Sequence, residues 1–159
     1  TTEAFTYLAA MLAEEPGIFN YVDAWNSHSY PNPAFSSAPQ KLGQNSLRGY
    51  QNELAFLGGY LDQNLDVYIT ETGWVDNPQT THNLTEYYKY AIQHIWSDER
   101  IKAVTPFVLK GDPGPFSRFS FLTGDDQPTH QYRSLQTALQ QLNTDHNFAA
   151  LISPLYRTY

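Results

Sequence analysis

The sequence predicts an α/β fold in which three parallel strands form a sheet and helices pack outside it. Segments with the apolar spacing of amphipathic helices alternate along the 159 residues with short apolar runs typical of buried strands. The connection after each predicted strand is long, whereas those after the first three predicted helices are short. Long loops at the C-terminal ends of parallel strands mark the functional face of such folds, so we expect the site there.

Four segments have helical periodicity. Thr2 is expected to cap the first, which Pro16-Gly17 ends, while Ser46 caps the second and Asn83 the third. The predicted apolar faces are Phe5, Leu8, Ala9 and Leu12; Tyr50, Leu54, Leu57 and Leu61; Tyr87, Tyr88, Ala91, Ile92 and Ile95; and Tyr132, Leu135, Ala138, Leu139 and Leu142.

Three strands are expected near residues 21–27, 66–71 and 101–109, parallel and adjacent in that order. The run Val67 to Thr70 is typical of a strand buried in a parallel sheet. Residues 1–142 are predicted to form one domain or part of one. Residues 143–159 have no clear pattern and are predicted to be a C-terminal tail.

The composition excludes several functions. The chain has 16 acidic and nine basic side chains, giving a formal net charge of −7. Nucleic acids and anionic membrane surfaces bind clustered Lys and Arg, so we expect neither partner. No apolar run approaches the ~20 residues that a membrane span needs. Aromatic residues make up 15% of the chain, which is unlike a disordered segment.

Metal and thiol chemistry are not expected. The chain has no Cys, so thiolate nucleophiles, disulfides and Cys-based metal sites are excluded. The five His residues are scattered without the spacing of metal ligands, and we predict no metal and no cofactor.

Polar and aromatic side chains follow each predicted strand. His28 and Tyr30 come after the first strand and, if the strand geometry persists, point the same way. Glu71 ends the second strand, where a carboxylate is awkward for packing and useful for chemistry. Glu71, His28 and Trp74 each also have a structural interpretation. In these interpretations Glu71 caps a helix or pairs with an Arg, His28 is a structural histidine, and Trp74 packs under its loop. Trp25 is expected in the core.

Three segments resemble a known family. The stretch VYITETGW resembles the seventh strand of the clan A retaining glycoside hydrolases, which are (β/α)8 TIM barrels. This resemblance implies that Glu71 is the catalytic nucleophile. VDAWNSHSYP resembles the preceding strand, which implies that Tyr30 hydrogen-bonds the nucleophile, at ~2.5–3.0 Å, and that His28 lines the sugar site. Trp74 is expected to border the same depression and to stack on sugar.

The third segment, AVTPFVLKGDPGPFSRFSF, resembles the eighth strand of that family. Phe107 stands where the family usually has a Trp that forms the floor of the subsite for the cleaved sugar. Asp112 follows this strand and is interpreted as a loop residue or a sugar hydrogen-bond partner. The candidate site residues are therefore catalytic Glu71 and Tyr30, with His28, Trp74, Phe107 and Asp112 binding substrate.

The resemblance covers only the sixth to eighth strands of the barrel, so a partial (β/α)8 barrel is expected. The family's acid/base Glu, usually in an Asn-Glu pair after the fourth strand, is expected upstream of Thr1. Asn52-Glu53 lies within a helical pattern and in the wrong chain order, and is interpreted as a surface dipeptide. No secretory signal segment is present in this chain; the resemblance is compatible with an extracytoplasmic protein.

The resemblance implies hydrolysis of glycosidic bonds in an oligo- or polysaccharide by a retaining mechanism. A non-catalytic carbohydrate-binding barrel protein is the alternative, and an unrelated α/β sheet that binds a small ligand is the third. The 159-residue piece alone is expected to be inactive, because one carboxylate is missing. Its unpaired barrel edges are expected to promote self-association.

Overall fold

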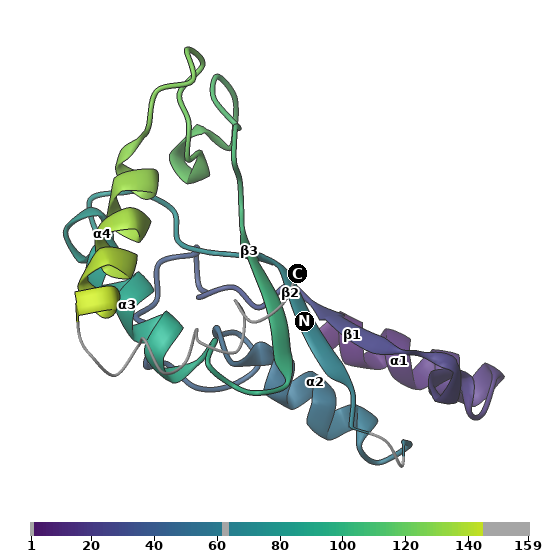
Figure 1. Cartoon of the computed structure of the whole chain (residues 1–159). Coiled ribbons are helices and arrows are strands. Elements are labelled where there is room, and N and C mark those ends of the chain that lie inside the picture. The colour runs from purple at the N-terminus through teal and green to yellow at the C-terminus, as the bar shows by residue number, and fades with distance from the viewer. Residues whose placement is uncertain (1, 62–63, 145–159) are drawn as a thin grey trace, which may run out of the picture. The chain divides into compact units, whose positions relative to one another are not determined.

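The computed structural model describes residues 2–61 and 64–144. The chain divides into two compact units (Figure 1). The first comprises Thr1–Val75 with His94–Phe107, and the second comprises Asp76–Gln93 with Val108–Tyr159. None of the helices formed by the described residues has the length and apolar character needed to cross a membrane.

The first unit contains a parallel sheet of three strands. Strands β1 (Ala24–Ser27), β2 (Asp66–Thr72) and β3 (Ile101–Pro106) lie in the order β1-β2-β3, as Figure 1 shows. Both pairings are parallel, with Ser27 opposite Ile69 in the first and Ile69 opposite Val104 in the second. The predicted α/β class, strand direction and strand order are therefore confirmed.

One face of the sheet is buried. The sequence places apolar side chains at alternate positions of β2, so Val67 and Ile69 are buried together on that face. Helices α1 (Thr2–Glu14) and α2 (Gly49–Leu57) belong to the same unit and share an apolar cluster. The buried cluster that joins them consists of Phe19, Leu57 and Leu65, with Leu8, Met11, Leu12, Ile18, Val22, Trp25, Leu54, Phe56 and Leu61 packed against it.

The opposite face is open within the described part of the chain. Tyr68 is 41% exposed, and Asn26 and Thr70 are also exposed. The prediction that Val67 to Thr70 form a fully buried strand is therefore wrong, since only every second side chain is covered. Parallel sheets are usually covered on both faces, so this open polar face is unusual.

Two predicted strands are shorter than expected. Tyr21 lies in a short 3-10 helix (Ile18–Tyr21) and is almost fully exposed, so β1 begins only at Ala24. β3 ends at Pro106 rather than at Leu109. The backbone of Val108 instead bonds to Phe119 and Phe121 in the following loop, which draws this part of the chain away from strand geometry.

Ser29, not Ser46, caps α2. The Ser46 hydroxyl accepts a hydrogen bond from the Arg48 amide in a turn before the helix. The amide of Tyr50 at the helix N-terminus donates to Ser29 Oγ at 2.8 Å. The Cβ of any larger residue at Gly49 would lie 2.8 Å from the Gln44 carbonyl oxygen and 3.2 Å from Ser29 Oγ. The helix can therefore approach Ser29 this closely only because residue 49 is glycine.

The second unit contains α3 (Leu84–His94) and α4 (His130–Thr144), preceded by 3-10 turns at Thr81–Asn83 and Ser117–Phe119. α3 begins directly after Asn83, as predicted. Among the described residues of this unit, the buried apolar side chains are Leu84, Tyr88, Ala91, Phe121, Ala138 and Leu142.

The predicted apolar face of α4 is partly wrong. Ala138 and Leu142 are buried, but Tyr132 and Leu139 are exposed. Gln131 and Ser134 take their places in the interior. Gln131 tolerates burial because its side chain accepts from the Tyr88 hydroxyl at 2.9 Å and donates to the Arg118 carbonyl at 3.2 Å. α4 includes residues 143 and 144; the rest of the predicted tail lies outside the described residues.

Asp98 connects α2 to the turn before β3. Its carboxylate accepts from Arg100 Nη2 at 2.7 Å, from Arg100 Nε at 3.1 Å and from the Tyr50 hydroxyl at 2.9 Å. The Arg100 hydrogen bond is the main reason that the pKa of Asp98 falls to about 2. Burial, with help from Asp98, raises the pKa of Tyr50 to about 12, so its hydroxyl stays a donor.

We expect Asp98→Asn to destabilise the protein in a pH-dependent way. Because folding lowers the pKa of Asp98, its contribution is fully present above pH ~4 and is lost as the pH falls through about 2. Urea unfolding should give a loss of about 1 kcal/mol at neutral pH that shrinks toward pH 2. Exposed Asp23→Asn is the control and should show no such trend. A pH-independent loss in Asp98→Asn would contradict the assignment.

Candidate functional site

Glu71 lies near the C-terminal end of β2, where the strand is irregular. The pairing of β2 with β3 shifts register between Ile69 and Thr72, so regular alternation of side chains is interrupted at Glu71. Gly73 follows with a φ of +124°, a conformation that favours glycine. The strand therefore ends at Thr72, one residue after Glu71, and the Glu71 carboxylate lies near the strand end, 39% exposed.

Tyr30 donates a hydrogen bond to this carboxylate. Its hydroxyl lies 3.2 Å from Glu71 Oε2, slightly farther than the predicted distance. The Tyr30 ring is held by the edge of Phe35, with ring centroids 5.0 Å apart. Burial raises the pKa of Tyr30, and the neighbouring charge of Glu71 raises it further. The hydroxyl therefore keeps its proton and remains a donor to Glu71.

His28 contacts the same oxygen. Its Nδ1 lies 3.5 Å from Glu71 Oε2, and its Nε2 lies 3.1 Å from Thr70 Oγ1. The Thr70 hydroxyl donates its proton to Asn26 Oδ1 at 2.8 Å, so it accepts from His28 and the ring carries a proton on Nε2. Nδ1 can then donate to Glu71 only in the imidazolium form. The open face of the sheet thus orients His28 through Asn26 and Thr70.

The other carboxylate oxygen remains available. Both contacts with Glu71 reach Oε2, and no residue in 2–61 or 64–144 donates a hydrogen bond to Oε1. Tyr30 stabilises negative charge on the carboxylate without blocking it. Such an arrangement suits a nucleophile, which needs one oxygen held and one free. The predicted convergence of Glu71, Tyr30 and His28 is present; their roles stay predictions.

Trp74 does not border this site as a stacking surface. It is fully buried, and its indole Nε1 donates to the Ser37 carbonyl at 2.8 Å. Its ring packs against Trp96, with centroids 6.4 Å apart. A sugar stacks only on an exposed ring face, so the predicted substrate contact is wrong and the structural alternative applies.

Phe107 and Asp112 lie in different units. Phe107 is half-buried, and its amide donates to the Thr72 carbonyl at 2.8 Å, which places it beside the end of β2. Asp112 belongs to the second unit, where its Oδ2 accepts from the Gly124 amide at 2.9 Å. This contact is typical of a loop residue, one of the two interpretations that the sequence left open.

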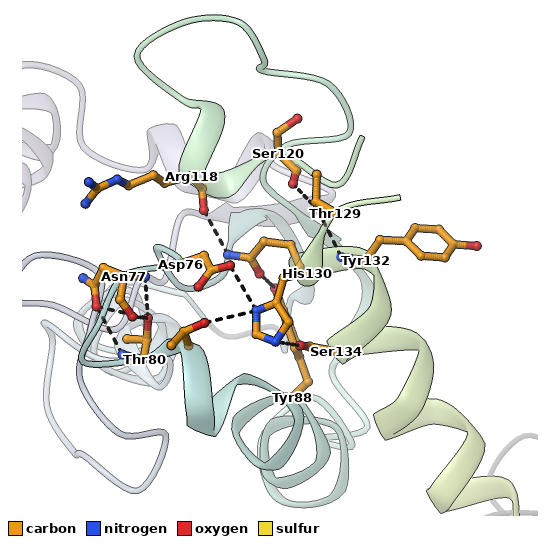
Figure 2. Close-up of polar contacts among 12 residues, drawn as sticks. Asp76, Asn77, Thr80, Tyr88, Arg118, Ser120, Thr129, His130, Tyr132 and Ser134 are labelled. Atoms are coloured by element: carbon orange, nitrogen blue, oxygen red, sulfur yellow. Dashed lines mark hydrogen bonds and ion pairs between the residues drawn. The ribbon is translucent and has the colours of Figure 1, made fainter. Parts of the chain in front are cut away.

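The second unit has its own polar cluster, drawn in Figure 2. His130 Nδ1 lies 3.0 Å from Asp76 Oδ2, and His130 Nε2 lies 3.3 Å from Ser134 Oγ. Thr81 Oγ1 also lies 3.3 Å from Nδ1. The order Ser-His-Asp is that of a hydrolytic triad, and the sequence gives no local signal for it, because Asp76 lies 54 positions from His130 in the chain.

Burial argues against nucleophilic chemistry in this cluster. Ser134 is only 3% exposed, in the second turn of α4. A nucleophile must reach an external carbonyl, whereas this hydroxyl faces the interior of its own unit. The contacts instead connect the start of α4 to the segment before α3. We interpret the cluster as a structural connection.

Other possible ligand groups are few. Among residues 2–61 and 64–144, no group of three or more His, Cys, Asp or Glu side chains is arranged to hold a metal ion.

Comparisons of the chain with protein-family models, curated proteins and solved structures find no match. The function of the site therefore has to be inferred from its geometry.

We expect Ser134 to be unreactive toward a fluorophosphonate probe, which labels activated serines. Intact mass spectrometry of the folded protein should detect no adduct, because the hydroxyl is buried. Ser134→Ala should lower the free energy of unfolding by about 1 kcal/mol through loss of the contact with His130. A probe adduct that disappears in Ser134→Ala would instead identify a working triad.

Proposed function

We propose that Glu71 is the nucleophile of a retaining glycoside hydrolase that acts on an oligo- or polysaccharide. The observation that carries this proposal is the Tyr30 hydroxyl donating to one oxygen of a strand-end carboxylate whose other oxygen is free among the described residues. The resemblance of VYITETGW and VDAWNSHSYP to two neighbouring strands of the clan A enzymes supports it.

In the proposed reaction Glu71 Oε1 attacks the anomeric carbon of the sugar. The new carbon–oxygen bond forms while the glycosidic bond breaks, and the leaving oxygen takes the electron pair and a proton from a second carboxylic acid. Tyr30 holds Glu71 in position and stabilises its charge before attack. His28 is placed to contact the sugar, because its exposed ring is anchored to both Thr70 and Glu71.

The second carboxylate is proposed to lie outside this segment. Within 2–61 and 64–144, no other carboxylate contacts Glu71, Tyr30 or His28. We propose that the sheet is part of a (β/α)8 barrel whose acid/base Glu comes from upstream, as the family resemblance implies. The open polar face of a parallel sheet, with β1 and β3 at its edges, supports this, because a closed barrel covers that face and pairs both edges.

A mechanism-based label tests Glu71 without the acid/base residue. Deoxyfluoro glycosides with a dinitrophenyl leaving group need no proton from the enzyme, and their glycosyl-enzyme intermediates break down slowly. We expect one such glycoside, among gluco, manno, galacto and xylo forms, to add one sugar mass to the protein. Peptide mapping should locate the adduct on Glu71.

Glu71→Gln is the matched control, since it retains size but removes the nucleophile. It should give no adduct while circular dichroism and the melting temperature remain unchanged. Failure of every glycoside to label folded protein would contradict the proposal. Saturable sugar binding without labelling would favour the non-catalytic carbohydrate-binding alternative.

Tyr30→Phe tests the proposed positioning of the nucleophile. Removing the hydroxyl deletes the hydrogen bond to Glu71 Oε2 but keeps the ring against Phe35. We expect the rate of labelling at saturating glycoside to fall about tenfold or more, since hydrogen bonds to charged groups contribute ~1.5–3 kcal/mol. Tyr21→Phe, at an exposed site, is the control. An unchanged labelling rate in Tyr30→Phe would remove this role.

A further inference from the structure

A cavity lies beside β1 in the first unit. It has a volume of about 200 Å³, is partly open to solvent and is lined by α1, β1 and α2. Its principal lining residues are Phe5, Leu8, Trp25, His28, Gln44 and Glu53. A cavity of ~150 Å³ holds benzene, so this one accepts a single six-membered ring with a short substituent.

The walls of the cavity are aromatic and fixed in place. The rings of Phe19 and Trp25 pack nearly perpendicular to each other, with centroids 6.3 Å apart. On the other side Phe5 packs against Phe56 at 5.4 Å. Small-ligand sites are typically apolar cavities with a few polar groups that fix orientation.

Glu53 supplies the charge in this cavity. Its Oε2 accepts from Trp25 Nε1 at 2.8 Å, and the side chain is half-buried. The interpretation of Asn52-Glu53 as a surface dipeptide is therefore wrong for Glu53, whereas Trp25 packs against the core as predicted and also lines the cavity. The error has a clear cause, since helical periodicity does not reveal that Trp25 reaches α2.

No cation balances this carboxylate within the described part of the chain. The cavity lining contains no Lys or Arg, and no ion pair of Glu53 is formed by residues 2–61 or 64–144. Arg48, five residues earlier, donates to the His94 carbonyl instead. The ring nitrogens of His28 face Thr70 and Glu71 instead of Glu53, and neither of those two residues lines the cavity.

We propose that this cavity binds a small organic ammonium ion on a six-membered ring frame. The ring occupies the space between Phe5 and Trp25, and the ammonium donates to the available Oε1 of Glu53. Aromatic rings beside a cation add a favourable cation–π interaction. An anionic ligand would be repelled by Glu53, while a neutral one would leave it without a charged partner. The proposal does not depend on glycosidase chemistry, because Glu71 does not line this cavity.

Binding is tested by NMR, following the Trp25 indole N–H signal, assigned with Trp25→Phe. Benzylamine and glucosamine are the ammonium probes, and benzyl alcohol and glucose are their neutral counterparts. We expect at least one amine to shift this signal saturably. The dissociation constant of its neutral counterpart should be about tenfold higher or more. Benzylamine alone would indicate an arylalkyl amine, glucosamine alone an amino sugar, and both an ammonium site tolerant of either ring.

Glu53→Gln keeps the shape and the acceptor for Trp25 while removing the charge. It should weaken the bound amine about tenfold or more, with little change for the neutral counterpart. Asp66→Asn removes a carboxylate of the same unit that does not line the cavity, and it should bind the amine normally. Equal binding of amine and neutral compound, unchanged affinity in Glu53→Gln, or no response to either amine would overturn the proposal. Labelling of Glu71 is a separate readout, so either proposal can fail alone.

Discussion

Parallel pairing of β1 with β2 is the constraint on which the candidate site depends. With Ser27 opposite Ile69, the two strands end at the same edge of the sheet. His28 and Tyr30 continue from one strand and Glu71 from the other, although about forty positions separate them in the chain. An antiparallel arrangement would place these side chains at opposite ends of the sheet. The direction of strand pairing therefore determines which side chains can meet at the site.

The segment after β1 is held by polar contacts that involve no catalytic group. The Thr72 hydroxyl donates to the Ser29 carbonyl at 2.6 Å, and Ser29 Oγ lies 2.9 Å from Ser27 Oγ. The same oxygen caps α2 at Tyr50. These contacts are buried, so they lose little strength to competing water. Ser29 thus fixes the backbone between His28 and Tyr30, which keeps both side chains directed toward Glu71.

Two carboxylates of the first unit have similar contacts and different surroundings. Glu71 and Glu53 each accept a hydrogen bond from a neutral aromatic donor, Tyr30 or Trp25. Glu71 lies at an open strand end, where a large substrate can approach its available oxygen. Glu53 lies in a cavity of about 200 Å³ that accepts one ring. Access rather than hydrogen bonding therefore distinguishes the chemistry proposed for the two groups.

The sequence by itself determined the α/β class, the strand order and the group formed by Glu71, Tyr30 and His28. The class and the strand order follow from local periodicity and from the rules for parallel strands, whereas the contact of Tyr30 and His28 with Glu71 is expected from the resemblance to the clan A enzymes. Only the tertiary structure decided that Trp74 is buried, that Ser29 rather than Ser46 caps α2, and that Glu53 faces a cavity with Trp25. Each of these depends on contacts between residues distant in the chain, where burial and hydrogen-bond satisfaction override local pattern. A sequence motif specifies which side chains leave a strand end, but the space around them is set by packing.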